Sequence, residues 1–264
     1  MNMKSRAPFV AALVAGLVGT AGVALAYTNQ STPDTATTAA KADIGNVSAP
    51  KDKAQSGFTY SYPADLAKRA PALVAQLEKE KAVAKAGYDK LLADYGDGDG
   101  SASAGSLLSS TQWRIESEND HLIILLAEYG EYQGGAHGMH ATLSKLWDKK
   151  ANKEIAFLDM FADPAAAKAV IMPSYCAMLD AERFGQRGKA TDKTDTFGDC
   201  PDPFEGTVYP DNLNGDQYLR IGISLPPYAA GPYSEGQYDL SIAAPTYITD
   251  LVKPEYKDIF QIYG

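Results

Sequence analysis

The chain has 264 residues, 45% of them hydrophobic and 22% charged, a composition that excludes wholesale disorder, collagen-like repeats and an all-coiled-coil design. Its length allows one domain or two small ones. The formal net charge of −9, with no basic stripe to offset it, excludes a surface that attracts nucleic-acid phosphates.

The N-terminus has the pattern of an export signal. Lys4 and Arg6 precede an uncharged apolar run at residues 9–26, which ends in the small-x-small sequence Ala-Leu-Ala. We therefore predict a signal peptide at residues 1–26 and a periplasmic or otherwise extracytoplasmic location in a bacterium. An uncleaved anchor is the alternative, because about 18 apolar residues can just span a bilayer.

The next segment, residues 27–56, is rich in Thr, Ala, Ser, Asp and Lys and has no apolar periodicity. Such a segment cannot bury enough surface to offset the entropy lost on ordering, so we predict a flexible linker. The folded domain is predicted over residues 57–264, and it begins with an alternating strand at residues 58–62.

A long amphipathic helix is predicted from residue 71 to about residue 95, because its apolar residues recur at spacings near 3.6. Three strands are expected next, around residues 113–116, at residues 121–129 and at residues 139–147. The second of these is nearly all apolar, which indicates a central strand covered on both faces.

The second half of the chain begins with a polar turn at residues 148–153. Asp163 and Pro164 then predict a helix start, and the helix runs toward Phe184 with Pro173 expected to kink or split it. The remaining predicted elements are a long acidic loop at 185–217, a strand with Tyr218, Ile223 and Leu225, a strand at 237–243, and a short helix with a tail at 246–260. Strands flanked by two or three helices, without regular β–α–β alternation, indicate an α+β fold with a mainly antiparallel sheet.

The two cysteines, Cys176 and Cys200, are predicted to form one disulfide. An exported chain meets an oxidising compartment, and this bond would pin the acidic loop to the second helix. On the chain-entropy model a closed loop of this length contributes about 3 kcal/mol. Two thiols without a CxxC pair do not predict a metal site.

The histidines invite a comparison with metal sites. His137 and His140 have the spacing of two ligands on a helix, but on a strand this spacing directs them to opposite faces. We predict that His137 is structural: Gly134 and Gly135 supply positive φ for a tight connection, and the ring bonds to the backbone there. No metal or cofactor is predicted.

Two acidic segments are candidate cation sites. Residues 97–101 resemble the opening of a calcium loop, but Ala102 and Leu108 stand where that loop needs glycine and glutamate. The second segment could hold a cation or meet a basic partner, but we predict a solvated loop. Its members are Asp192, Asp195, Asp199, Asp202 and Glu205.

The most distinctive segment joins the last two strands, at residues 225–233. Two prolines stiffen it before Tyr228, and Gly231 with the following proline fixes a turn after it. A rigid loop that exposes tyrosines loses little entropy on binding, so the candidate ligand-binding residues are Tyr228, Tyr233, Pro227 and Gly231. The alternative is that Tyr228 packs back onto the sheet edge.

Three motifs in order resemble the PdaC/RsiV-like domain family. They are Gly-Gly-Ala-His at residues 134–137, Ile-Ala-Phe-Leu-Asp-Met-Phe at residues 155–161, and Pro-Tyr-Ala-Ala-Gly-Pro at residues 227–232. The resemblance covers roughly residues 57 to 250. It implies an extracytoplasmic α+β domain, which accompanies a peptidoglycan deacetylase in one branch of the family. In another branch it is the lysozyme-binding ectodomain of an anti-sigma factor.

The chain departs from both branches. Only eight residues precede the apolar run, so no cytoplasmic sigma-binding segment is expected, and a deacetylase domain after residue 264 is likewise not expected. We predict an exported, non-enzymatic envelope protein that binds a lysozyme-like muramidase or a peptidoglycan fragment, with membrane contact only through an uncleaved N-terminus. The alternatives are an enzyme acting on wall polysaccharide through His137 with Glu128 and Glu131, and a structural factor of the envelope.

Overall fold

A computed structural model describes residues 57–96, 107–211, 220–245 and 247–260. The predicted signal peptide and linker, the acidic segment 97–101 and Tyr218 lie outside these residues. Within the described ranges no helix combines the length and the apolar character needed to cross a membrane.

The first half of the domain forms a five-stranded sheet with the order β1-β2-β3-β4-β5. The strands are β1 (Gly57–Ser61), β2 (Leu108–Glu118), β3 (Leu122–Tyr132), β4 (Met139–Asp148) and β5 (Lys153–Ile155). β1 runs parallel to β2, and the other neighbouring pairs are antiparallel. The short edge strand β5 follows directly after the polar turn that the sequence predicts.

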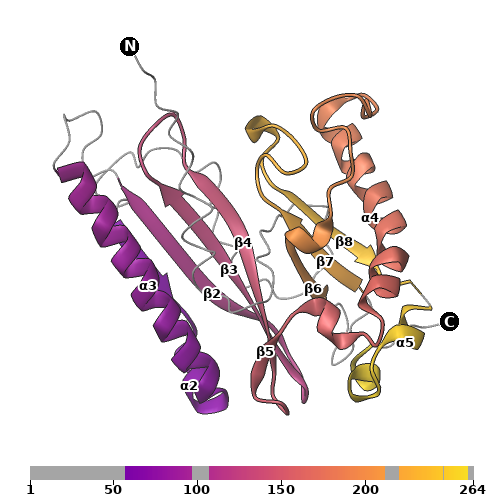
Figure 1. The fold of residues 1–264 in the computed structure, drawn as a ribbon, viewed down its shortest axis with the longest axis horizontal. Helices are drawn as coiled ribbons and strands as arrows, with labels where there is room; N and C mark the ends of the chain where they lie inside the picture. The colour runs from indigo at the N-terminus through magenta and orange to yellow at the C-terminus, as the bar shows by residue number, and fades with distance from the viewer. Residues whose placement is uncertain (1–56, 97–106, 212–219, 246, 261–264) are drawn as a thin grey trace, which may run out of the picture.

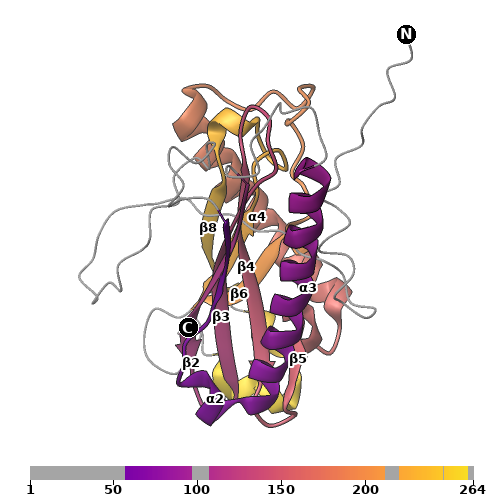
Figure 2. The ribbon, with the colours of Figure 1, turned by 90° about the vertical axis from the view of Figure 1, so that its left-hand side faces the viewer.

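Helices α2 (Leu66–Arg69) and α3 (Pro71–Gly96) cover one face of this sheet (Figures 1 and 2). Leu73 and Leu77 of α3 pack there against Ile123 and Leu125 of β3. The alternate β3 residues, such as Ile124, belong to a second core on the opposite face. The apolar run at residues 122–127 of β3 is therefore explained by burial on both faces, as the sequence predicts.

The second half of the domain forms a three-stranded antiparallel sheet with the order β6-β7-β8. Its strands are β6 (Thr207–Asp211), β7 (Arg220–Leu225) and β8 (Tyr238–Ala243). Helix α4 (Pro164–Arg187) packs against it, and the second core lies among α4, this sheet and the larger sheet. The short elements are η2 (Phe157–Met160), η3 (Pro203–Glu205), η4 (Tyr233–Glu235), α5 (Ile248–Leu251) and η5 (Pro254–Ile259).

Helix α4 begins where the sequence predicts. The Asp163 carboxylate accepts a hydrogen bond from the Ala166 N–H (3.0 Å), and Pro164 occupies the first turn. Pro173 does not split the helix, because α4 is continuous from residue 164 to residue 187; the expected kink stays a prediction. Pro173 and Ala169 are both exposed, so the Ala169 carbonyl, which has no proline N–H to accept from, faces solvent.

The expectation of an unbroken acidic loop at residues 185–217 is wrong, because β6 and η3 lie within it. β6 has only five residues and contains Pro210, so its sequence signal is weak. The strand is at the edge of its sheet, where one side has no partner strand and proline is tolerated.

The predicted α+β class, with mainly antiparallel strands packed against helices, is confirmed. The strands are divided between two sheets, which meet along β4 and β6. There the Thr207 hydroxyl donates a hydrogen bond to the carbonyl of Thr142 (3.2 Å). This contact places the β3–β4 and β7–β8 connections at the same end of the molecule (Figure 1).

Candidate functional site

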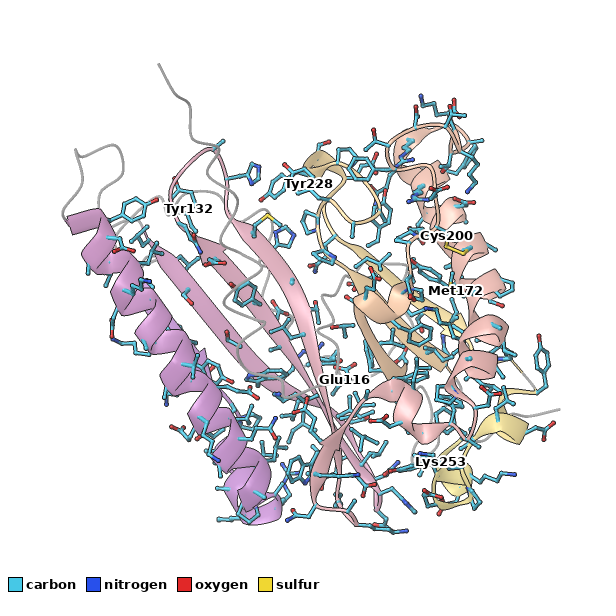
Figure 3. The ribbon with its side chains drawn as sticks, viewed as in Figure 1. Glu116, Tyr132, Met172, Cys200, Tyr228 and Lys253 are labelled. Atoms are coloured by element: carbon cyan, nitrogen blue, oxygen red, sulfur yellow. A yellow bond between two sulfur atoms is a disulfide. The ribbon has the colours of Figure 1, made fainter. Side chains whose placement is uncertain are left out.

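One connection from each sheet contributes aromatic rings to a common cluster. The ring of Tyr233 stacks on the ring of His137, with 3.7 Å between centroids and 22° between planes. The Tyr228 hydroxyl lies 3.2 Å from His137 Nε2. Figure 3 shows Tyr228 at this end, between the two sheets. We call His137, Tyr228 and Tyr233 the tyrosine site, and residues 226–233 the tyrosine loop.

The β3–β4 connection fixes the position of His137. Gly134 and Gly135 adopt positive φ values of 89° and 103°, as a tight connection requires. The Tyr132 hydroxyl donates to the carbonyl of Gly135 (2.9 Å). His137 Nδ1 lies 3.0 Å from the carbonyl of Gly138, so it carries the proton, and Nε2 accepts from Tyr228.

The polar contacts of the His137 ring bear on the enzymatic alternative. Its two ring nitrogens contact a backbone carbonyl and a phenol. Glu131 accepts a hydrogen bond from the Tyr129 hydroxyl (2.6 Å), and Glu128 lies opposite Thr142 in the register of β3 and β4. Within the described ranges, no group of three or more His, Cys, Asp or Glu side chains is arranged to hold a metal ion. The described contacts of His137 thus fit its predicted structural role.

The tyrosine loop presents Tyr228 to solvent. The Tyr228 side chain is 49% exposed, and its backbone has a φ of 79°, which is unusual for a bulky residue. Its N–H donates to the carbonyl of Gly231 (3.1 Å), and the Ala229 N–H donates to the carbonyl of Pro226 (3.2 Å). Two hydrogen bonds therefore close the turn that carries the exposed ring.

The other two candidate ligand-binding residues, Pro227 and Gly231, are buried. A Cβ atom at Gly231 would meet the carboxylate of Glu235, so a larger residue there would displace the Glu235 side chain from its contact with Arg187. Pro227 and Gly231 shape the loop, and Tyr228 is its exposed aromatic residue.

Two arginines of α4 hold the tyrosine loop. Arg183 is fully buried, and its Nε donates to the carbonyl of Ala230 (3.0 Å). Arg187 forms a bidentate pair with Glu235, with both N–O distances 2.8 Å, and also reaches the Ala230 carbonyl (3.4 Å). Burial acts to raise the pKa of Glu235, but hydrogen bonds from Arg187 and Tyr238 outweigh it and lower that pKa. The carboxylate is therefore ionised at neutral pH, and the pair fixes the end of the loop.

His140 lies beneath the site, edge-on to Tyr233 with 6.2 Å between ring centroids. Its ring is buried, and this burial lowers the pKa of His140, so the ring is neutral at neutral pH. Burial, with a smaller contribution from Tyr228, raises the pKa of Tyr233. Tyr233 is therefore present as a neutral phenol at neutral pH.

The Cys176–Cys200 disulfide joins α4 to the α4–β6 loop (residues 188–206), with 5.6 Å between Cα atoms. Asp199, next to Cys200, accepts a hydrogen bond from Arg183 Nη2 through its carbonyl (2.9 Å). Two members of the acidic cluster have local roles: Asp192 accepts from the Thr194 N–H (2.9 Å), and Asp202 pairs with Lys168. The cluster is thus partly explained by turn and ion-pair contacts.

Sequence reasoning missed the arginines and Glu235. The signal for Arg183 lies in the spacing of the buried residues of α4, which recur at every fourth position. The series is Ala167, Ile171, Tyr175, Leu179 and Arg183. An arginine at the next position of a buried stripe implies buried acceptors. The sequence does not indicate that those acceptors are carbonyls of two distant loops.

No protein-family model matches the chain, and no curated protein matches it. Among solved structures, it is similar to a DUF3298 family protein from Pseudomonas aeruginosa PAO1, with 20% identity and a TM-score of 0.44, over 60% of this chain and 66% of that one. It is also similar to a DUF3298 family member from Bacteroides fragilis NCTC 9343, with 18% identity and a TM-score of 0.45, over 69% of this chain and 70% of that one. The chain thus matches slightly less than two thirds of the first of these structures. The PdaC/RsiV-like resemblance stays a prediction.

Proposed function

We propose that this protein is an exported, non-enzymatic binding protein of the bacterial cell envelope, of the PdaC/RsiV-like type. Its tyrosine site contacts a lysozyme-like muramidase or the wall glycan that such an enzyme cleaves. The observation that carries this proposal is the exposed Tyr228 ring on a turn fixed by buried hydrogen bonds.

The backbone of Tyr228 supports a binding role. A non-glycine residue at φ 79° costs free energy that the rest of the fold must offset, and such positions cluster at ligand-binding sites. The loop is ordered before any partner arrives, so little entropy is lost on binding. A tyrosine ring offers a flat apolar face and a polar tip, which suit a sugar ring or a protein cleft.

The charge of the chain favours a protein ligand of basic character. The formal net charge of −9 attracts a cationic muramidase and speeds its encounter with the site. Association with a basic muramidase should therefore weaken as salt increases. Binding of a neutral oligosaccharide should change little over the same range.

Calorimetry of residues 57–264 distinguishes these ligands. We expect heat of binding with a basic c-type lysozyme or with soluble peptidoglycan fragments, titrated separately at low and moderate salt. A salt-sensitive signal with lysozyme alone identifies the muramidase, and a salt-insensitive signal with fragments alone identifies the glycan. No binding to either probe contradicts the proposal.

The enzymatic alternative is tested on the same preparation. The protein is incubated with peptidoglycan, and the products are analysed for released or deacetylated sugars. We expect none, because the contacts of His137 are a carbonyl and a phenol. Sugar release that disappears in a folded His137→Ala variant would establish the enzyme instead.

A further inference from the structure

A single buried side chain connects the tyrosine loop to the disulfide. The guanidinium of Arg183 has no exposed surface, and it donates to Ala230 O from Nε and to Asp199 O from Nη2. Ala230 lies in the turn that carries Tyr228, and Asp199 is bonded in sequence to Cys200. One planar group thus bridges two loops that are 31 positions apart in the chain, 230 minus 199.

We propose that the Cys176–Cys200 disulfide controls the tyrosine site through Arg183, which acts as a positioning residue for Tyr228. While the disulfide is intact, it holds the Asp199 carbonyl in hydrogen-bond contact with the Arg183 guanidinium. The guanidinium in turn keeps its hydrogen bond to the Ala230 carbonyl. Opening the disulfide releases residues 188–206 and loosens the turn at Tyr228. The inference rests on the proposed function only in naming this turn as the ligand-contacting segment.

The physical basis is the cost of burying a charge. The remaining Arg183 donor contact in the described structure is Nη1 to Asp180 Oδ1 at 3.4 Å, which is long for a charged pair. Without the Asp199 carbonyl, the buried guanidinium loses one of its two short hydrogen bonds and must seek water. A guanidinium that moves toward water also leaves the Ala230 carbonyl.

The disulfide is accessible to reduction. Both sulfur-bearing side chains are only partly buried, so a dithiol can reach the bond. Reduction transfers two electrons and two protons from the dithiol to the two sulfurs, which become thiols, and the dithiol becomes a disulfide. The site would therefore respond to a dithiol reductant outside the cytoplasm.

Hydrogen exchange of the ligand-free protein tests the link directly. The reporters are the amide hydrogens of Tyr228 and Ala229, which close the turn. Reduction with dithiothreitol, or the Arg183→Lys substitution, should each speed their exchange by about tenfold. Lysine keeps the charge but cannot bridge two carbonyls with a planar fork. The control is Arg69→Lys, on an exposed ion pair of α2, which should leave these amides unchanged.

The effects of reduction and of Arg183→Lys on the exchange rate should not add. In Arg183→Lys the link is already broken, so reduction should speed exchange at Tyr228 and Ala229 little further. Unchanged exchange at these amides after complete reduction, confirmed by mass, overturns the proposal. A full additional effect of reduction in Arg183→Lys, or an equal rise in the amides of β2 and β3, also overturns it. Should Arg183→Lys fail to fold, the reduced wild-type protein decides the question.

This test uses no ligand, so its outcome is separate from that of the proposed function. Fast exchange after reduction in a protein that binds neither lysozyme nor wall fragments supports the link and contradicts the function. Unchanged exchange after reduction, in a protein that binds lysozyme, supports the proposed binding function and overturns the link between the disulfide and the turn.

Discussion

At the scale of single residues, the backbone of Tyr228 is the most informative feature. Its φ of 79° is a conformation that glycine adopts without strain and that a side chain disfavours by about 1 kcal/mol. The ring is half exposed, so stability is not its main role. A tyrosine at a position where glycine fits better indicates a role for the ring itself.

Two substitutions of Tyr228 distinguish the effect of backbone strain on stability from the effect of losing the ring. Both Tyr228→Gly and Tyr228→Ala remove the ring. Only glycine also relieves the strain of the positive φ, because alanine keeps its Cβ atom. We expect the glycine variant to be the more stable by about 1 kcal/mol in urea unfolding. Equal stability of the two variants, or a more stable alanine variant, would show that the turn is not strained.

His140 should make stability depend on pH. Burial lowers its pKa in the folded protein, whereas the unfolded chain has the ordinary value of about 6.5. Above that pH the residue is neutral in both states. As the pH falls below it, the unfolded state binds the proton first, so folding stability decreases down to the folded pKa.

The measurement is urea unfolding at several pH values between 8 and about 5. The wild-type protein should lose stability more steeply toward pH 5 than a His140→Phe variant, which has no proton to bind. Groups common to both proteins cancel in this comparison. Parallel pH profiles would mean that His140 is not held neutral by the fold.

At the scale of elements, the disulfide connects α4 to a loop with little regular structure. Removing it by Cys176→Ala together with Cys200→Ala should lower the free energy of unfolding by about 3 kcal/mol. The fold should persist, because the cysteines lie at the edge of the core, and circular dichroism should be unchanged. Loss of the native spectrum, or unchanged stability in urea, would contradict this expectation.

The elements with strong local signals were predictable from the sequence. α3 has an apolar face at helical spacing, α4 begins with an aspartate followed by a proline, and β3 opens with six apolar residues. β6 was missed because five residues containing Pro210 carry little periodicity. The continuity of α4 through Pro173 depends on which side of the helix faces solvent, and this is a property of the tertiary structure.

At the scale of the whole molecule, the tyrosine site exists because two sheets are joined. Its rings come from the β3–β4 connection of one sheet and the β7–β8 connection of the other. The sequence marked Tyr228, Tyr233 and His137 separately, because turn residues give each connection a local signal. It gave no sign that His137 and Tyr228 meet across 91 positions, since such a contact depends on how the two sheets pack.

The central claim is that this assembled site contacts the ligand, and calorimetry of tyrosine variants tests it most directly. The titrants are c-type lysozyme and soluble peptidoglycan fragments, and the variants are Tyr228→Ala and Tyr233→Ala. Tyr247→Ala is the matched control, because Tyr247 is 58% exposed and lies beside α5, away from the site. An anchor tyrosine contributes about 2 kcal/mol, so we predict that Tyr228→Ala weakens binding about thirtyfold while Tyr247→Ala binds normally. Unchanged affinity in both site variants, or an equal loss in Tyr247→Ala, would contradict the account.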